Sequence, residues 1–193
     1  RMESHHADVA LEGEYLDPTT RVAIAGIARA GTLPAYRTFD RLCELLDPEG
    51  VRVDHMLISR RLDAAGHVLG VECRGTKIGG ALEDHLLLMP DPMGATGSTI
   101  LYALELYAKE VGGVVNKPIA MHLIVTPEYI RNVRQQAPEL EIYALRVDRG
   151  MSPPDVLACV PGERLDDERG LDERDYIVPG MGGLAELMTN CWV

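Results

Sequence analysis

One junction constrains the possible folds of this chain more than any other feature: residues 85–110 read HLLLMPDPMGATGSTILYALELYAKE. The apolar run HLLLM predicts a buried strand, and residues 98–110 predict a helix because their apolar side chains recur at helical spacing. The loop between them holds an acidic residue, two glycines and several small hydroxyl-bearing side chains. A strand that passes through such a loop into a helix is the repeating unit of α/β proteins, so the junction predicts that fold class.

Strands and helices alternate along the rest of the chain as well. The run RVAIAGIA predicts a strand, and the helix after it is expected to begin at Thr32 and to stop at Asp47-Pro48. Further strands are predicted for VRVDHMLIS, KPIAMHLIVT and LEIYALRVD, with a helix in PEYIRNVRQQA, while HVLGVEC resembles one arm of a hairpin. This order predicts a mostly parallel central sheet flanked by helices. At 193 residues, the chain 1–193 is expected to form a single domain, with an irregular excursion over residues 149–175.

The charge of the chain limits its partners. A net charge of -11 argues against nucleic acid and anionic membranes, which are bound by clustered Lys and Arg. No apolar run is long enough to cross a bilayer, and the first residues do not have the pattern of a signal peptide, so a cytoplasmic protein is predicted. The four cysteines lie far apart, which suggests neither a disulfide framework nor a protein metal site.

The loop between the apolar run HLLLM and the helix at 98–110 has the composition of a phosphate-binding turn. At the carboxyl end of a parallel strand, backbone N–H groups and a helix N-terminus can point at an anion. Gly94 and Gly97 would allow a tight turn, hydroxyl side chains would add donors, and Asp91 would stand beside sugar hydroxyls. An ordinary capped helix after a glycine turn explains the composition equally well, since Thr96 or Ser98 is a good N-cap. A Walker loop is excluded because no Lys follows the second glycine.

Four segments resemble one family. LLLMPDPMGATGST is similar to the phosphoribosyl diphosphate (PRPP) loop DPMxATGGS of uracil phosphoribosyltransferases, which are type I phosphoribosyltransferases. DYIVPGMGG at 175–183 resembles that family's base-recognition segment YIVPGLGDAGDR, AGIARAG at 25–31 resembles its ILRAG loop, and VDHMLISRR resembles VGHIGLYRD. The order along the chain is the family's order, and the resemblance spans roughly Val22 to Gly183. It implies the type I phosphoribosyltransferase fold with a small hood or base-recognition region, in a divergent member that lacks the family's N-terminal segment.

The resemblance also implies an activity and a set of ligands. The activity is transfer of phosphoribose from PRPP to uracil or a related pyrimidine-like base, with Mg²⁺ bound through the diphosphate and not through protein side chains. The implied catalytic residues are Asp91, Arg29 and Arg60. The implied PRPP-binding residues are Ala30, Gly31, Asp91, Met93, Gly94, Ala95, Thr96, Gly97, Ser98 and Thr99. The implied base-binding residues are Tyr176, Ile177, Pro179, Gly180, Gly182 and Gly183, in an assembly expected to be a homodimer or a larger homo-oligomer.

Several residues keep a structural interpretation beside the functional one. Gly183 stands where the family carries an acid, with Glu186 near the second acid, so a catalytically impaired homologue that senses PRPP or a nucleotide is the alternative function. Tyr176 is more often a packed aromatic than a base-stacking residue. His55, His85 and His122 fall in expected strands, where core histidines outnumber catalytic ones. The acidic run ERLDDERGLDERD is expected to be a solvated face or a flap near the base site.

Overall fold

The computed structural model of the protein describes residues 15–62, 68–111, 115 and 117–190, without the side chains of Arg60, Leu62, Val68 and Leu69. Its centre is one seven-stranded sheet in the order β3-β2-β1-β4-β6-β5, with β7 paired to β6. The strands are β1 (Arg21–Ala28), β2 (Val51–Leu62), β3 (Val68–Lys77), β4 (His85–Pro90), β5 (Met93–Gly94), β6 (Pro118–Val125) and β7 (Glu141–Val147). The helices are α1 (Thr32–Cys43), η1 (Pro48–Gly50), α2 (Ser98–Val111), α3 (Pro127–Gln136), α4 (Pro154–Leu157) and α5 (Leu184–Thr189).

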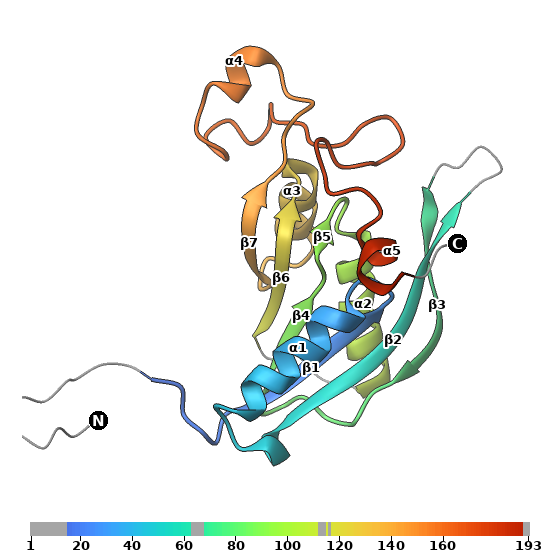
Figure 1. The fold of residues 1–193 in the computed structure, drawn as a ribbon, viewed down its shortest axis with the longest axis vertical. Coiled ribbons are helices and arrows are strands. Elements are labelled where there is room, and N and C mark those ends of the chain that lie inside the picture. Colours follow the sequence, from blue (N-terminus) through green and yellow to red (C-terminus); the bar gives the residue numbers. More distant parts are fainter. Residues whose placement is uncertain (1–14, 63–67, 112–114, 116, 191–193) are drawn as a thin grey trace, which may run out of the picture.

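The described strand pairings are parallel except for the hairpin of β2 and β3. The predicted parallel sheet and the predicted hairpin arm are therefore both confirmed. Because parallel strands end at the same edge, the segments that follow β1, β4, β6 and β7 gather there. The chain beyond β7, drawn orange to red in Figure 1, rises past this edge and returns over it to α5.

Two apolar cores form because β1 is covered on both faces. Its residues Val22 and Ile24 pack with Ala35 of α1, while Ala23 and Ile27 face a larger core that includes α2 and α3. Figure 1 shows α1 in front of the sheet and α2 and α3 behind it. Alternate side chains of a strand point to opposite faces, so a strand that is apolar throughout needs helices on both. The predicted three-layer arrangement is confirmed.

Two predictions for individual elements, the burial of β4 and the end of α1, differ from the structure. The run HLLLM was expected to form a buried strand, yet in β4 His85, Leu87 and Met89 are buried whereas Leu86 and Leu88 are half-buried. The reason is that α1 packs mainly on β1 and β2 and covers β4 incompletely. The helix expected from Thr32 begins there but ends at Cys43, four residues before the Asp47-Pro48 stop.

The three histidines predicted to lie in strands differ in burial. His55 is exposed on β2, so its interpretation as a core residue was wrong. His85 is buried, but its Nδ1 has no hydrogen-bond partner in the described residues, while its Nε2 lies 3.3 Å from Arg52 Nη1. His122 is buried and bonded at both ring nitrogens. None of the described helices has both the length and the apolar character that a membrane span requires.

Candidate functional site

The carboxyl ends of β1 and β4 open into a cavity of about 900 Å³. Its walls come from the loops after these two strands, from the β2–β3 hairpin and from residues 175–186. The predicted site residues that line it are Arg29, Ala30, Gly31, Asp91, Met93, Gly94, Ala95, Thr96, Gly97, Thr99, Tyr176, Ile177, Pro179, Gly180, Gly182 and Gly183. Ser98 is not among the lining residues, and the side chain of Arg60 lies outside the described part. The structure thus brings three distant segments around one cavity.

The loop after β4 has its carbonyl groups tied to the neighbouring β6–α3 junction. The carbonyl of Gly94 accepts from the Thr126 amide at 3.0 Å, and that of Ala95 accepts from Thr126 Oγ1 at 2.5 Å. The carbonyl of Thr96 accepts from Asn132 Nδ2 at 2.7 Å. Three successive acceptors are therefore satisfied by the protein itself.

Several amides of the same loop, unlike its carbonyls, lack protein partners among the described residues. Within the described residues, no protein acceptor is bonded to the N–H groups of Ala95, Thr96, Gly97 and Thr99. The hydroxyls of Thr96 and Ser98 lie 2.9 Å apart, and the Ser98 amide reaches Thr96 Oγ1 only at 3.4 Å, which is a weak cap. A loop with satisfied carbonyls and unbonded amides beside a helix N-terminus has the polarity that an anion requires.

Both glycines of the loop are required by packing. A Cβ on Gly94 would lie 2.8 Å from Cδ2 of Tyr129 and 3.0 Å from Cγ1 of Val125. Gly97 has φ +85, and a Cβ there would lie 3.1 Å from Val133. The aromatic ring under the loop therefore fixes the position of the turn, a reason for glycine that the sequence did not reveal.

Asp91 is held from below by a buried histidine. His122 Nδ1 donates to the Asp91 carbonyl at 2.5 Å, its Nε2 accepts from the Tyr129 hydroxyl at 2.7 Å, and the Asp91 amide donates to Met121 at 3.0 Å. Burial lowers the pKa of His122 to about 4 and raises the pKa of Tyr129 well above its ordinary value. His122 is thus a neutral structural support, as expected for a core histidine, and it fixes the backbone from which the Asp91 side chain projects.

The loop after β1 brings Arg29 to the same cavity. Gly31 closes the turn by donating to Ile27 at 2.9 Å, and a Cβ on it would lie 2.7 Å from the Ile27 carbonyl oxygen. The Arg29 side chain is about one third exposed, and its Nη2 lies 2.7 Å from Glu186 Oε1. The Ala28–Arg29 and Val178–Pro179 peptide bonds are both cis, and both lie in segments that line the cavity.

The segment predicted to bind the base presents main-chain groups. Ile177 pairs with Leu171 in an antiparallel bridge whose hydrogen bonds run through the flanking residues, from Asp172 to Tyr176 and from Val178 to Gly170. Within the described residues, the N–H and C=O of Ile177 therefore have no hydrogen-bond partner. The Gly182 carbonyl accepts from Leu184 at 3.0 Å, whereas its N–H donates to no described residue. Tyr176 is 66% exposed, so it is not a packed aromatic.

A carboxylate that the sequence analysis did not single out positions this segment. Asp148, buried just after β7, accepts from the Gly180 amide at 2.9 Å and from Arg146 Nε at 2.5 Å. Gly150 donates to Val178 at 2.9 Å. Asp148 follows the end of a parallel strand just as Asp91 does, and that placement is the signal by which it could have been found.

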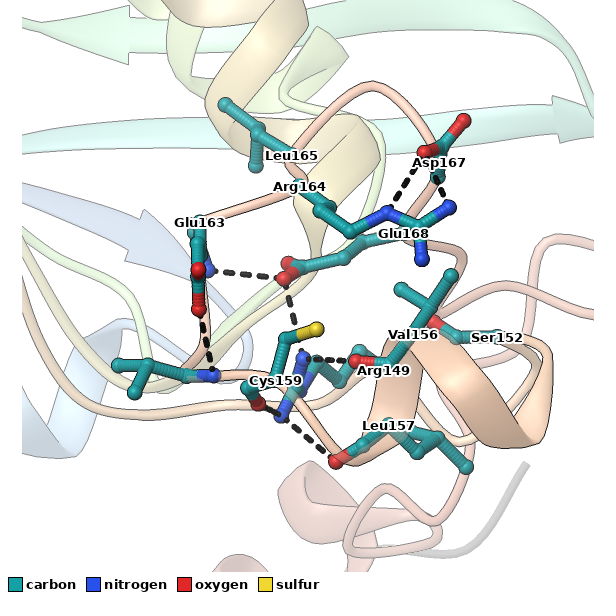
Figure 2. Close-up of polar contacts among 12 residues, drawn as sticks. Arg149, Ser152, Val156, Leu157, Cys159, Glu163, Arg164, Leu165, Asp167 and Glu168 are labelled. Atoms are coloured by element: carbon teal, nitrogen blue, oxygen red, sulfur yellow. Dashed lines mark hydrogen bonds and ion pairs between the residues drawn. The ribbon is translucent and has the colours of Figure 1, made fainter.

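The excursion after β7 is compact. Figure 2 shows Arg149 donating to Glu168 Oε1 at 3.0 Å and to the carbonyls of Val156 and Leu157 at 3.0 and 3.2 Å. Glu168 is fully buried, and its Oε1 also accepts from the Gly162 amide at 2.8 Å. The interpretation of the acidic run as a solvated face was therefore wrong for Glu168, which anchors the loop that carries the base segment.

Two other charged residues line the cavity, of which the sequence analysis named Glu186 and missed Arg74. Arg74 of β3 lines it and is paired with Glu72 at 2.8 Å. Glu186 of α5 lines it and contacts Arg29, and its Oε2 lies 2.8 Å from where a Cβ on Gly183 would stand. No local pattern marks Arg74, because it reaches the cavity from the β2–β3 hairpin, whereas the motif located Glu186 but not its contact with Arg29.

The fold and this cavity define an α/β protein with an amide-lined loop and a main-chain edge at the carboxyl end of its sheet. The sequence profile of the uracil phosphoribosyltransferase family matches residues 3–162, and the chain therefore belongs to that family. The match ends before the base segment, so it bears on the Arg29 and Asp91 loops and not on residues 175–186.

Individual relatives agree with this assignment. The chain is 28% identical to the uracil phosphoribosyltransferase of Thermococcus sibiricus over 112 residues, which are 58% of this chain and 39% of that protein. It is 26% identical to uracil phosphoribosyltransferase 1 of Schizosaccharomyces pombe over 137 residues, 71% of this chain and 51% of that protein. The matched region is thus only about two fifths to one half of each relative's length.

One solved structure supports the fold over nearly the whole chain. The AQ2163 protein from Aquifex aeolicus has a TM-score of 0.63 and 22% identity, with 93% of this chain and 69% of that chain covered. The expected fold, a mostly parallel sheet flanked by helices in a divergent family member, is confirmed.

Proposed function

We propose that the protein transfers phosphoribose from PRPP to uracil, or to a closely related pyrimidine, and releases diphosphate and the nucleoside monophosphate. The observation that carries the proposal is one cavity in which amides of the loop after β4 and the main chain of Ile177 have no hydrogen-bond partner among the described residues. A ligand with a phosphate at one end and a planar hydrogen-bonding ring at the other would satisfy both. Family membership supports the same reaction class.

The phosphate end has two parts in this proposal. The 5′-phosphate takes the amides of Ala95 to Thr99, together with the Thr96, Ser98 and Thr99 hydroxyls. The diphosphate takes the Ala30-Gly31 turn and the side chains of Arg29 and Arg60, since guanidinium groups match phosphate oxygens in charge and geometry. Asp91 binds the ribose hydroxyls between the two.

The base end favours uracil over cytosine. Along its Watson–Crick edge uracil presents an acceptor, a donor and an acceptor, whereas cytosine presents an acceptor, an acceptor at N3 and an amino donor. The N–H and C=O of Ile177 offer a donor and an acceptor, and the Gly182 N–H offers a second donor. These three groups complement uracil and would leave the cytosine amino group facing a donor.

Catalysis in this site is positioning and electrostatics. As the bond to diphosphate breaks, positive charge develops on the ribose, and the proposal assigns the Asp91 carboxylate to stabilise that charge. Among the described residues, no group of three or more His, Cys, Asp or Glu side chains gathers as a metal site. In this proposal Mg²⁺ would be bound by diphosphate oxygens and water, and would supply charge to the leaving group.

The test is diphosphate release from PRPP and Mg²⁺ in the presence of uracil, cytosine, thymine, orotate, adenine or hypoxanthine. Steady release with uracil and little with cytosine is expected. PRPP binding without release from any base would instead indicate the sensor alternative, which the comparisons do not support.

The assembly and the location of the protein also remain predictions. A homodimer or a larger homo-oligomer is expected, and light scattering coupled to size-exclusion chromatography would measure it. A cytoplasmic location is expected as well, and fractionation of the source cells would test it.

A further inference from the structure

Glu186 forms an ion pair with Arg29, the arginine to which the proposed function assigns diphosphate. Its Oε1 lies 2.7 Å from Arg29 Nη2, in a pair whose side chains are 22% and 36% exposed. A carboxylate and a diphosphate oxygen bind a guanidinium through the same N–H groups. Both residues line the cavity, so the contact is made inside the site.

This contact joins α5 to the loop after β1. Among the described residues, the other hydrogen bonds of α5 run within residues 182–190, from Leu184 to Gly182, from Leu187 to Gly183 and from Asn190 to Glu186. The helix is six residues long and has no buried residue. A short helix with no fully buried residue and an ion pair to the rest of the described chain can leave its position at low cost when a competing anion arrives.

The glycine at 183 allows the carboxylate to sit where it does. A Cβ at this position would lie 2.8 Å from Glu186 Oε2, closer than real Cβ contacts come. The backbone of Gly183 has φ -75 and ψ 74, so its φ is one that other residues adopt. The absence of a side chain at 183 is thus matched to the position of the Glu186 carboxylate and not to the local value of φ.

We propose that Glu186 is a positioning residue that competes with diphosphate for Arg29. In the empty site its carboxylate holds the guanidinium and docks α5 at the cavity. When the diphosphate group of PRPP binds, it replaces the carboxylate on Arg29 and α5 is released. After transfer, the returning carboxylate displaces the product diphosphate. The proposal rests on the proposed function only in placing diphosphate at Arg29.

The experiment is calorimetric titration of the whole chain with inorganic diphosphate and Mg²⁺. Glu186→Gln keeps the size of the side chain and removes the competing charge, so it should bind diphosphate about five- to tenfold more tightly. Gly183→Ala should tighten binding in the same direction, because the new methyl group displaces the carboxylate while Glu186 is still present. The double variant should match Glu186→Gln within about twofold, since the two changes act through one contact.

Two controls separate this effect from general ones. Glu83→Gln removes one charge from the loop before β4, at the opposite edge of the sheet, and should leave diphosphate affinity unchanged. In an Arg29→Gln background, Glu186→Gln should have no effect, because the group for which it competes is gone. Thermal melting of each variant shows whether the fold is kept.

The outcomes distinguish the two proposals. Diphosphate affinity that is unchanged or weaker in Glu186→Gln, or unaffected by Gly183→Ala, overturns the competition even when the wild type turns over uracil. Tighter binding in both variants supports the competition even when no base is turned over, in which case only the proposed function fails. Failure of the wild type and of Glu186→Gln to bind diphosphate at all overturns both.

Discussion

The phosphate end and the base end of the cavity are built differently. The loop of residues 91–99 rests on the core. Buried His122 and Tyr129 support it, and Thr126 and Asn132 donate hydrogen bonds to its carbonyls. The base segment of residues 175–183 is supported by Asp148 at the end of β7 and by the excursion of residues 149–175, which Arg149 and Glu168 hold together. The loop is thus supported by core residues of the sheet and helices, and the base segment mainly by the excursion that follows β7.

This difference matches the two parts of the proposed ligand. Every ligand would carry the phosphate, whereas the base would differ from one ligand to another. A phosphate requires unbonded amides in a fixed array, which a strand-to-helix junction on a packed core supplies. The base is recognised by a surface segment that a change in the excursion could move without disturbing the sheet. We therefore expect substitutions at the phosphate end to affect turnover and stability, and those at the base end to affect the choice and affinity of the base.

The largest effect is expected from Asp91→Asn. It keeps the shape of the side chain and removes the charge that faces the ribose, so kcat should fall by roughly 10²–10³-fold while the melting temperature stays within a few degrees. Steady-state kinetics with PRPP and uracil measures this. An unchanged kcat would show that Asp91 does not face the reacting sugar.

Acid should weaken the phosphate end through His122. Its pKa is about 6.5 in the unfolded chain and about 4 in the protein, so between these values the unfolded state binds more protons. Stability should therefore fall as the pH drops from 6.5 to 4, by about 3 kcal/mol for this residue. Urea unfolding at several pH values should show a shallower dependence in His122→Gln. Equal slopes in both proteins would mean that His122 is not buried as a neutral group.

Glycines at the two ends should differ in their effect on stability. Gly94→Ala sets a methyl group 2.8 Å from the Tyr129 ring and should lower the free energy of unfolding by about 1–3 kcal/mol. Gly183→Ala meets only the flexible end of Glu186 and should stay within about 0.5 kcal/mol of the wild type. Similar losses in both would contradict the view that only one end rests on the core.

The smallest effect is expected from Asp148→Ala. It removes the acceptor of the Gly180 amide and should raise the KM for uracil by roughly tenfold, with the KM for PRPP changed less than about twofold. Asp166→Ala, on the exposed part of the same excursion, is the matched control and should change neither value. Equal increases in both KM values would contradict the view that Asp148 acts on the base segment alone.

The strand, the glycine loop and the helix were predictable from the sequence because they are neighbours in the chain. Arg29, Asp91 and the predicted loop residues except Ser98 line one cavity, while their role in binding phosphate stays a prediction. The reason for Gly94 was out of reach, since the ring that excludes a side chain belongs to Tyr129, beyond another strand. Thr126 and Asn132 were missed for the same reason.

The base end was predicted only in part. Its motif located Ile177 and Gly182, but the supports of this segment come from contacts that no local pattern encodes. Glu186 reaches Arg29 across 157 positions, and Glu168 is buried within a run whose composition indicates a solvated face. Asp148 alone had a usable signal, its place at the end of β7.

The most direct test of the central claim is a crystal structure of the protein with PRPP and Mg²⁺. The account predicts the 5′-phosphate within hydrogen-bonding distance of the amides of Ala95 to Thr99, with the ribose beside Asp91. PRPP bound elsewhere with this loop empty would contradict the account.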